Sequence, residues 1–191
     1  IEGEWPHAYE PSGKARIGKS LIWRTLDDGR PIYNRKLSVD EVHQRIQRYA
    51  LPYQAQLQKL INEHHQQFGV CYHINCHSMS AVSGKMGEGG AGIARADVVL
   101  GDRDGTTCSA EFTHLVKDFM QQCGYEVKIN DPFKGVELVR AFSNPSQGKH
   151  SLQIELNKRL YTDASGRDKG PGYDKLNQDL IALTALLADF S

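Results

Sequence analysis

The stretch HSLQIELNKRLY, residues 150–161, alternates apolar and polar side chains through its middle. That period of two predicts a β-strand with Gln153, Glu155 and Asn157 on one face and aliphatic residues on the other. A carboxylate on such a face, beside a zinc-bound water, can take the water's proton as the water attacks a carbonyl group. The same pattern also fits the solvated face of an edge strand, so both interpretations of Glu155 stay open at this point.

A second polar strand face is predicted in VCYHINCH, residues 70–77. His73 and His77 share it, and His77 falls where the strand runs out into a loop. Ligands of open α/β sheets usually bind at such strand ends, which suits His77 to metal binding or proton transfer. A hydrogen-bonded structural histidine is the alternative. The two Cα atoms would be about 13 Å apart, near the limit for sharing one zinc ion, so His77 is the single candidate ligand.

Arg140, within GVELVRAF at residues 135–142, is the third candidate for chemistry. A guanidinium group binds a carboxylate through two parallel hydrogen bonds, so Arg140 suits recognition of a carboxylate on a substrate. A surface salt bridge is the alternative.

Composition excludes several classes of protein. The 191 residues have a formal net charge of zero and scattered basic residues, which argues against a nucleic-acid partner. No apolar run approaches the roughly 18 residues of a membrane span, so we expect a soluble protein. Four cysteines without a CxxC pair indicate free thiols in a reducing compartment, and hence the cytoplasm. Because the chain begins at Ile1, a removed signal peptide is also compatible with it.

The elements that would position these residues alternate between helices and strands. A helix is predicted at 38–67, with Ser38 and Glu41 as a capping box and a break or kink at Pro52. Two more helices and five strands complete the prediction: helices at 108–123 and 173–190, and strands at 70–79, 97–102, 125–130, 138–142 and 150–161. This order predicts one layered α/β domain over residues 1–191, with a parallel or mixed sheet.

Several of these segments, taken in order, resemble one enzyme family. They are NCHSM (75–79), VLGDRDGTTCS (99–109), NDPFKGVELVRAF (130–142) and HSLQIELNKRLY (150–161), preceded by GRPIYNRKLSVDEVHQRIQRYALPYQAQL (29–57). The set is similar to the N-formylglutamate amidohydrolase family, which is related to the zinc carboxypeptidases. The resemblance implies a three-layer αβα sandwich with a mixed, largely parallel sheet. It also implies hydrolysis of an amide bond by a metal-activated water.

The resemblance assigns a role to each candidate. His77 would be a zinc ligand, Glu155 the general base, and Arg140 the residue that holds the substrate's carboxylate, while Gln153 and Asn157 would line the site. The implied cofactor is zinc, and the implied substrate is a small N-acyl amino acid such as N-formylglutamate. Two alternatives stay open: a related zinc deacylase or carboxypeptidase with another substrate, or a non-catalytic module that binds acyl-amino acids. The oligomeric state also stays open.

The chain departs from the family pattern at identifiable positions. Asn75 stands where the family usually has Asp, and Gly135-Val136 replaces a glycine pair. A histidine-containing segment of the family would lie upstream of residue 1, so we expect an N-terminally incomplete domain, with a degenerate relative of the family as the alternative. A catalytic zinc site takes three protein ligands, and this chain offers one clear candidate.

Overall fold

The computed structural model describes residues 18–19, 22–26, 28–85 and 90–190. The chain divides into two compact units, Ile1–Leu60 with Ser83–Ile93 and Ile61–Val82 with Ala94–Ser191. The candidate residues for catalysis all belong to the second unit. The expectation of a single domain over residues 1–191 stays a prediction.

The first unit is dominated by the helix predicted from residue 38 onward, which is confirmed. Helix α2 spans Val39–Arg45, a π-helical turn follows at Ile46–Ala50, and α3 spans Leu51–Phe68, ending in the second unit. The Ser38 hydroxyl accepts the N–H of Glu41 at 3.1 Å, which satisfies a backbone donor at the helix start. The helix does not end at Pro52. The turn before the proline is π-helical, and the Leu51 N–H bonds to the carbonyl of Ile46, five residues back.

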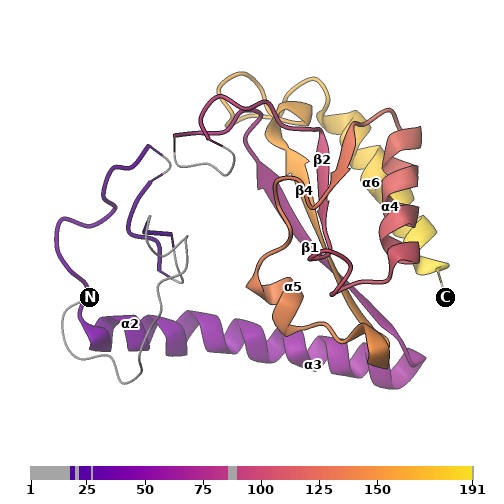
Figure 1. Cartoon of the computed structure of the whole chain (residues 1–191), viewed down its shortest axis with the longest axis horizontal. Helices are drawn as coiled ribbons and strands as arrows, with labels where there is room; N and C mark the ends of the chain where they lie inside the picture. The colour runs from indigo at the N-terminus through magenta and orange to yellow at the C-terminus, as the bar shows by residue number, and fades with distance from the viewer. Residues whose placement is uncertain (1–17, 20–21, 27, 86–89, 191) are drawn as a thin grey trace. The chain divides into compact units, whose positions relative to one another are not determined.

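The second unit is built on a four-stranded sheet (Figure 1). Its strands, in the spatial order β1-β4-β2-β3, are Cys71–Met79, Lys149–Asn157, Val98–Gly101 and Val127–Ile129. The pairs β1–β4 and β2–β3 are parallel, and β2–β4 is antiparallel. The predicted α/β fold with a mixed, largely parallel sheet is therefore confirmed.

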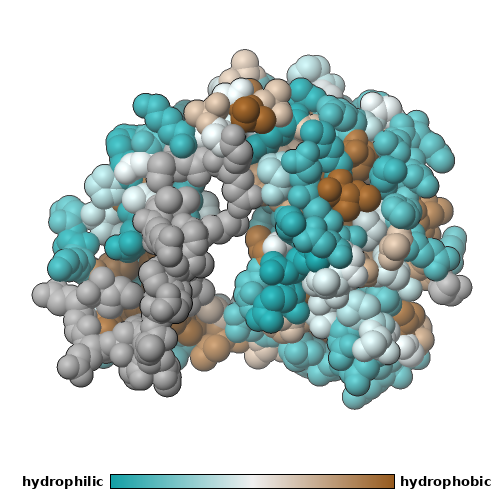
Figure 2. Space-filling model, in the orientation of Figure 1, coloured by the Kyte–Doolittle hydropathy of each residue, from teal (hydrophilic) through white to brown (hydrophobic). Residues whose placement is uncertain are grey.

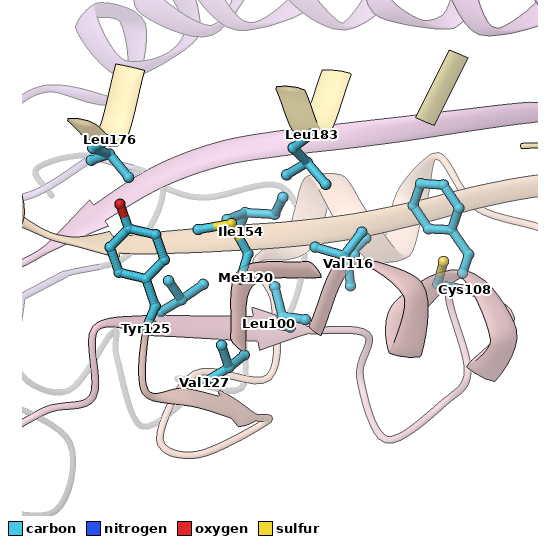
Figure 3. Close-up of a cluster of buried hydrophobic side chains, with 12 residues drawn as sticks. Leu100, Cys108, Val116, Met120, Tyr125, Val127, Ile154, Leu176 and Leu183 are labelled. Atoms are coloured by element: carbon cyan, nitrogen blue, oxygen red, sulfur yellow. The ribbon is translucent and has the colours of Figure 1, made fainter. Parts of the chain in front are cut away.

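Two helices cover one face of this sheet: α4, Ala110–Gln122, and α6, Tyr173–Ala188 (Figure 1). Both have apolar residues at helical spacing, which places them along one side of each helix. In Figure 3 Leu183 of α6 points toward Ile154 of β4 and Leu176 toward Tyr125, with Val116 and Met120 of α4 in the same cluster. The main hydrophobic core of the unit therefore lies between the sheet and these two helices.

The opposite face of the sheet carries shorter segments. Helix α5, Glu137–Ala141, contacts β4 there. Short 3-10 turns at Pro145–Gln147 and Lys158–Leu160 flank β4 in the sequence. The prediction of a strand at 138–142 is wrong: five residues are too few to show a period, and the Val139 N–H bonds to the carbonyl of Val136 in a helical turn. Helical segments thus lie on both sides of the sheet.

The face of the described residues drawn in Figure 2 is mostly polar. In Figure 2 hydrophobic residues are scattered singly or in small groups among hydrophilic ones on the face that is drawn. None of the helices in the described part of the chain has the length and apolar character to cross a membrane.

Candidate active site

The register of β1 against β4 places four of the five predicted site residues, His77, Gln153, Glu155 and Asn157, on one face of the sheet. Parallel neighbours in register present their side chains on the same face, here the face away from α4 and α6. The pairs on that face are His73 with Ser151, Asn75 with Gln153, His77 with Glu155, and Met79 with Asn157. The two polar strand faces recognised in the sequence are therefore one continuous surface, and His77 lies beside Glu155 on it.

Glu155 is a buried carboxylate next to a more accessible imidazole. Its side chain is 8% exposed, whereas that of His77 is 37% exposed. The Nδ1 atom of His77 lies 3.6 Å from Oε1 of Glu155, and the same Oε1 accepts a hydrogen bond from Nε2 of Gln153 at 2.9 Å. A carboxylate held in this way on a strand can act as a proton acceptor whose position is defined by its neighbours.

Gln153 connects this carboxylate to a loop that lies over the sheet. Its side-chain Oε1 accepts the backbone N–H of Val136 at 2.9 Å, and the residue is 1% exposed. The loop approaches β2 so closely that a Cβ atom on Gly101 would lie 2.7 Å from the backbone nitrogen of Gly135. Only glycine at position 101 allows this contact without a shift of the loop. Whether Gln153 also contacts substrate stays a prediction.

Asn157 is fully buried, and its side chain forms hydrogen bonds with backbone groups. Its Nδ2 donates to the carbonyls of Arg95 and Ala96, at 3.2 and 3.0 Å, and its Oδ1 accepts the N–H of Arg159 at 3.1 Å. The side chain thus fixes the segment that leads into β2. Its predicted contact with substrate is not tested by these bonds and stays a prediction.

Arg140 forms a surface salt bridge, which the sequence analysis gave as the alternative to substrate binding. It lies on α5 and forms an ion pair with Glu137 through Nε, at 2.9 Å, and through Nη2. Hydrogen bonding to Glu137 raises the pKa of Arg140, and the same contact lowers the pKa of the Glu137 carboxyl. Both side chains are largely exposed, so a competing carboxylate can reach the guanidinium group. Binding of substrate by Arg140 stays a prediction.

Arg95 is a second arginine on the same side of the sheet, and sequence reasoning missed it. Its guanidinium carbon lies 4.8 Å from the centre of the Phe133 ring. Phe133 packs against the small cluster of Met79, Ala96 and Val99, in which Val99 is the register neighbour of Glu155. The Nε atom is buried and makes no hydrogen bond in the part of the chain that the structure describes. No local pattern marked it, because its contact with Phe133 joins segments that are far apart in the sequence.

His73 is a hydrogen-bonded structural histidine. Its Nδ1 lies 2.7 Å from the hydroxyl of Ser151, a residue with no exposed surface. Burial lowers the pKa of His73, so the imidazole is neutral at neutral pH. Ser151 is too deeply buried to act as a nucleophile, so this contact is structural.

The described residues do not contain a complete set of zinc ligands. Among them no three His, Cys, Asp or Glu side chains are grouped as metal ligands, whereas a catalytic zinc takes three protein ligands. His77 alone has the chemistry and the position that the prediction requires, with Glu155 beside it.

The cysteines do not add to the site. All four are free thiols, as predicted. Burial raises the pKa of the Cys108 thiol to about 12, so the nucleophilic thiolate is scarce at neutral pH. Cys108 therefore packs in the hydrophobic core.

Comparison with known proteins gives consistent matches. The family model described as N-formylglutamate amidohydrolase matches residues 6–162. An N-formylglutamate deformylase of Pseudomonas putida is 24% identical over 142 residues, which are 73% of this chain and 52% of the relative. A deformylase of the same name from Pseudomonas aeruginosa is 25% identical over 142 residues, with the same two shares covered. The chain therefore spans about half the length of these curated relatives.

One solved structure matches nearly the whole chain. The crystal structure of N-formylglutamate amidohydrolase from Ralstonia eutropha JMP134 is 41% identical in sequence, with a TM-score of 0.89. The match covers 99% of this chain and 68% of that one.

Proposed function

The chain belongs to the N-formylglutamate amidohydrolase family, and from that premise we propose that the full-length protein hydrolyses N-formylglutamate to formate and glutamate. The two Pseudomonas relatives are named as N-formylglutamate deformylases and the solved structure as an N-formylglutamate amidohydrolase, which supports this substrate. Since the chain spans about half of the curated relatives, the activity is a proposal for the whole protein.

One observation carries the proposal: a buried carboxylate, Glu155, is held on a central strand beside the more exposed His77. Glu155 accepts a proton from the attacking water as the water oxygen bonds to the formyl carbon. The C–N bond then breaks, and Glu155 returns the proton to the leaving nitrogen. The products are formate and the free amino group of glutamate, so atoms and protons balance.

Zinc is part of the proposal, with His77 as one ligand. A bound zinc ion would supply Lewis acidity toward water and the carbonyl oxygen. Such a site needs further ligands besides His77. No group of three candidate metal ligands occurs in the described part of the chain, so these ligands are not supplied by the described neighbours of His77 and Glu155.

We assign the substrate's carboxylate to Arg140, in line with the family resemblance. The ion pair with Glu137 would exchange for one with the substrate, at little cost because both partners are exposed. Arg95 is the competing candidate, since its guanidinium group stacks on Phe133 beside the sheet face that carries Glu155.

The partner that this assignment requires is a small N-acyl amino acid. The formal net charge of zero and the basic residues scattered along the sequence favour a small molecule over nucleic acid as the partner. Four free thiols are typical of a reducing compartment, which supports a cytoplasmic location.

The direct test is an assay of the full-length protein with N-formylglutamate, N-acetylglutamate and a peptide ending in glutamate, together with zinc determination by mass spectrometry. We expect Glu155→Gln to lower kcat by about 10³-fold while bound zinc is retained, because the variant keeps the shape of Glu155 and loses the base. Glu126→Gln, at an exposed position, is the matched control. Unchanged turnover in Glu155→Gln would overturn the mechanism. Substrate-induced thermal stabilisation without turnover in the wild type would identify a binding module instead.

A further inference from the structure

The side chain of Gln153 has its two polar ends engaged by different parts of the molecule. Oε1 accepts from the Val136 N–H, and Nε2 donates to Oε1 of Glu155, both at 2.9 Å. Gln153 and Glu155 are two residues apart on β4 and so share a face, with Cα atoms about 7 Å apart. With 1% of its surface exposed, Gln153 is deeper in the protein than the carboxylate it touches.

The orientation of this amide follows from the chemistry of its partners. A backbone N–H can only donate, so the oxygen of Gln153 must face Val136. The NH₂ group must then face Glu155, whose ionised carboxylate can only accept. The flipped amide would set donor against donor at one end and acceptor against acceptor at the other, so both bonds would be lost together.

The Val136 N–H is itself held in place through the loop that precedes it. Asn130 donates from Nδ2 to Oδ1 of Asp102 at 2.7 Å and accepts the Asp102 N–H at 3.1 Å. The next residue of the β2 loop, Arg103, donates its N–H to the carbonyl of Lys134 at 2.8 Å and its Nη1 to that of Gly135 at 2.9 Å. These bonds attach both ends of the loop at 130–135 to the end of β2.

From this geometry we propose that Gln153 is a positioning residue, which transmits the fixed position of the Val136 N–H to the carboxylate of Glu155. It acts through Glu155 and does not bind substrate. The inference rests on the proposed function, in which Glu155 is the base. It differs from the role in substrate binding that the sequence suggested, because both polar ends of the side chain are already used.

Two substitutions distinguish the contributions of the two hydrogen bonds made by the Gln153 side chain. Gln153→Glu keeps the shape and the acceptor for Val136 but replaces the donor that faces Glu155 with a like charge. Gln153→Met keeps a similar volume and removes both bonds. Gln147→Glu is the matched control, because it adds the same charge at an exposed position and preserves the acceptor that Gln147 offers to Asn144.

Steady-state kinetics of the full-length protein distinguish positioning from substrate binding. We expect both Gln153 variants to lower kcat by about 10-fold to 100-fold with KM within about twofold, and the control to change neither. A KM raised tenfold with kcat unchanged would make Gln153 a substrate ligand and overturn the proposal.

Nuclear magnetic resonance tests the bonds without any turnover. We expect the Val136 amide to be protected from hydrogen exchange in the wild type and in Gln153→Glu, and to lose protection in Gln153→Met. We also expect a Gln153 side-chain amide proton to move upfield in Glu155→Met. Equal Val136 protection in all variants, or an unmoved Gln153 resonance, would contradict the proposal. A wild type with these signals but no hydrolysis would disprove the proposed function alone.

Discussion

The two faces of β4 use the same backbone for different purposes. Leu152 and Ile154 point toward α4 and α6 and are at most 5% exposed. Gln153 and Glu155, which alternate with them, point to the opposite side and are also buried. Both faces are buried. The apolar face is stabilised by non-directional packing, whereas the buried polar groups of the other face are satisfied by hydrogen bonds between particular atoms.

Because of that difference, we expect substitutions on one face of β4 to change mainly stability and substitutions on the other face to change mainly activity. The apolar face needs volume and shape, so its substitutions change the free energy of unfolding. The polar face needs a partner in the right direction for every donor and acceptor, so its substitutions first disturb the carboxylate that we propose as the base. Neighbouring residues on β4 should therefore give opposite phenotypes.

The largest effect on stability is expected from the apolar face. Ile154→Ala should lower the free energy of unfolding by about 3 kcal/mol, because it removes buried methylene groups and leaves a cavity. Its kcat, measured where the variant is folded, should stay within about twofold of the wild type, in contrast to Glu155→Gln. Denaturant unfolding and initial rates measure the two quantities. A kcat loss in Ile154→Ala as large as that in Glu155→Gln would break the separation.

A change at the boundary between loop and sheet should affect both properties. Gly101→Ala would place a Cβ atom 2.7 Å from the Gly135 nitrogen and 2.8 Å from the Lys134 carbonyl carbon. We expect a loss of about 2 kcal/mol in stability, typical of overpacking, and a fall in kcat as Val136 moves away from Gln153. Gly105→Ala is a poor control because its φ of 77° is itself strained in alanine. Ala110→Gly, in the first turn of α4, is the better control, because it should lower stability without moving the loop at 130–135.

A smaller effect should separate the two arginines on the polar side of the sheet. Arg140→Met should raise KM for N-formylglutamate about tenfold, or about 1.4 kcal/mol, with little change in kcat. Arg95→Met should leave KM within about twofold. The reverse result would assign the carboxylate to Arg95, whose Nε lacks a hydrogen bond in the described part of the chain.

The smallest effect is expected from pH. Nδ1 of His150, on the apolar face, accepts the Ser109 N–H at 3.1 Å, and burial lowers the pKa of His150 as it does that of His73 on the polar face. Since both folded values lie below the unfolded value, their contribution to stability is present above about pH 6.5 and is lost as pH falls through the folded values. The double variant His73→Gln/His150→Gln should flatten stability against pH below 6.5. If the melting temperature of the double variant fell with decreasing pH as steeply as that of the wild type, the prediction would be contradicted.

Local patterns predicted most of the elements but not all of the contacts. The helix start at Ser38 and the alternation of side chains in β1 and β4 were predicted, because each is visible within a few residues of sequence. The five-residue helix α5 was mistaken for a strand because it is shorter than two helical turns. The family resemblance pointed to His77 and Glu155, and the structure brings them together. Arg95 was missed because its contact with Phe133 joins distant parts of the chain.

The sequence by itself determined which residues of β4 alternate and which helices have an apolar side, because those properties depend on neighbours in the chain. Only the tertiary structure decided that β1 pairs with β4 in the register that sets His77 beside Glu155. It also decided that the Val136 N–H meets Gln153. Shifting the β1 register by one residue would turn His77 to the other face of the sheet. Such a choice is made by the packing of both faces at once, and no short stretch of sequence contains it.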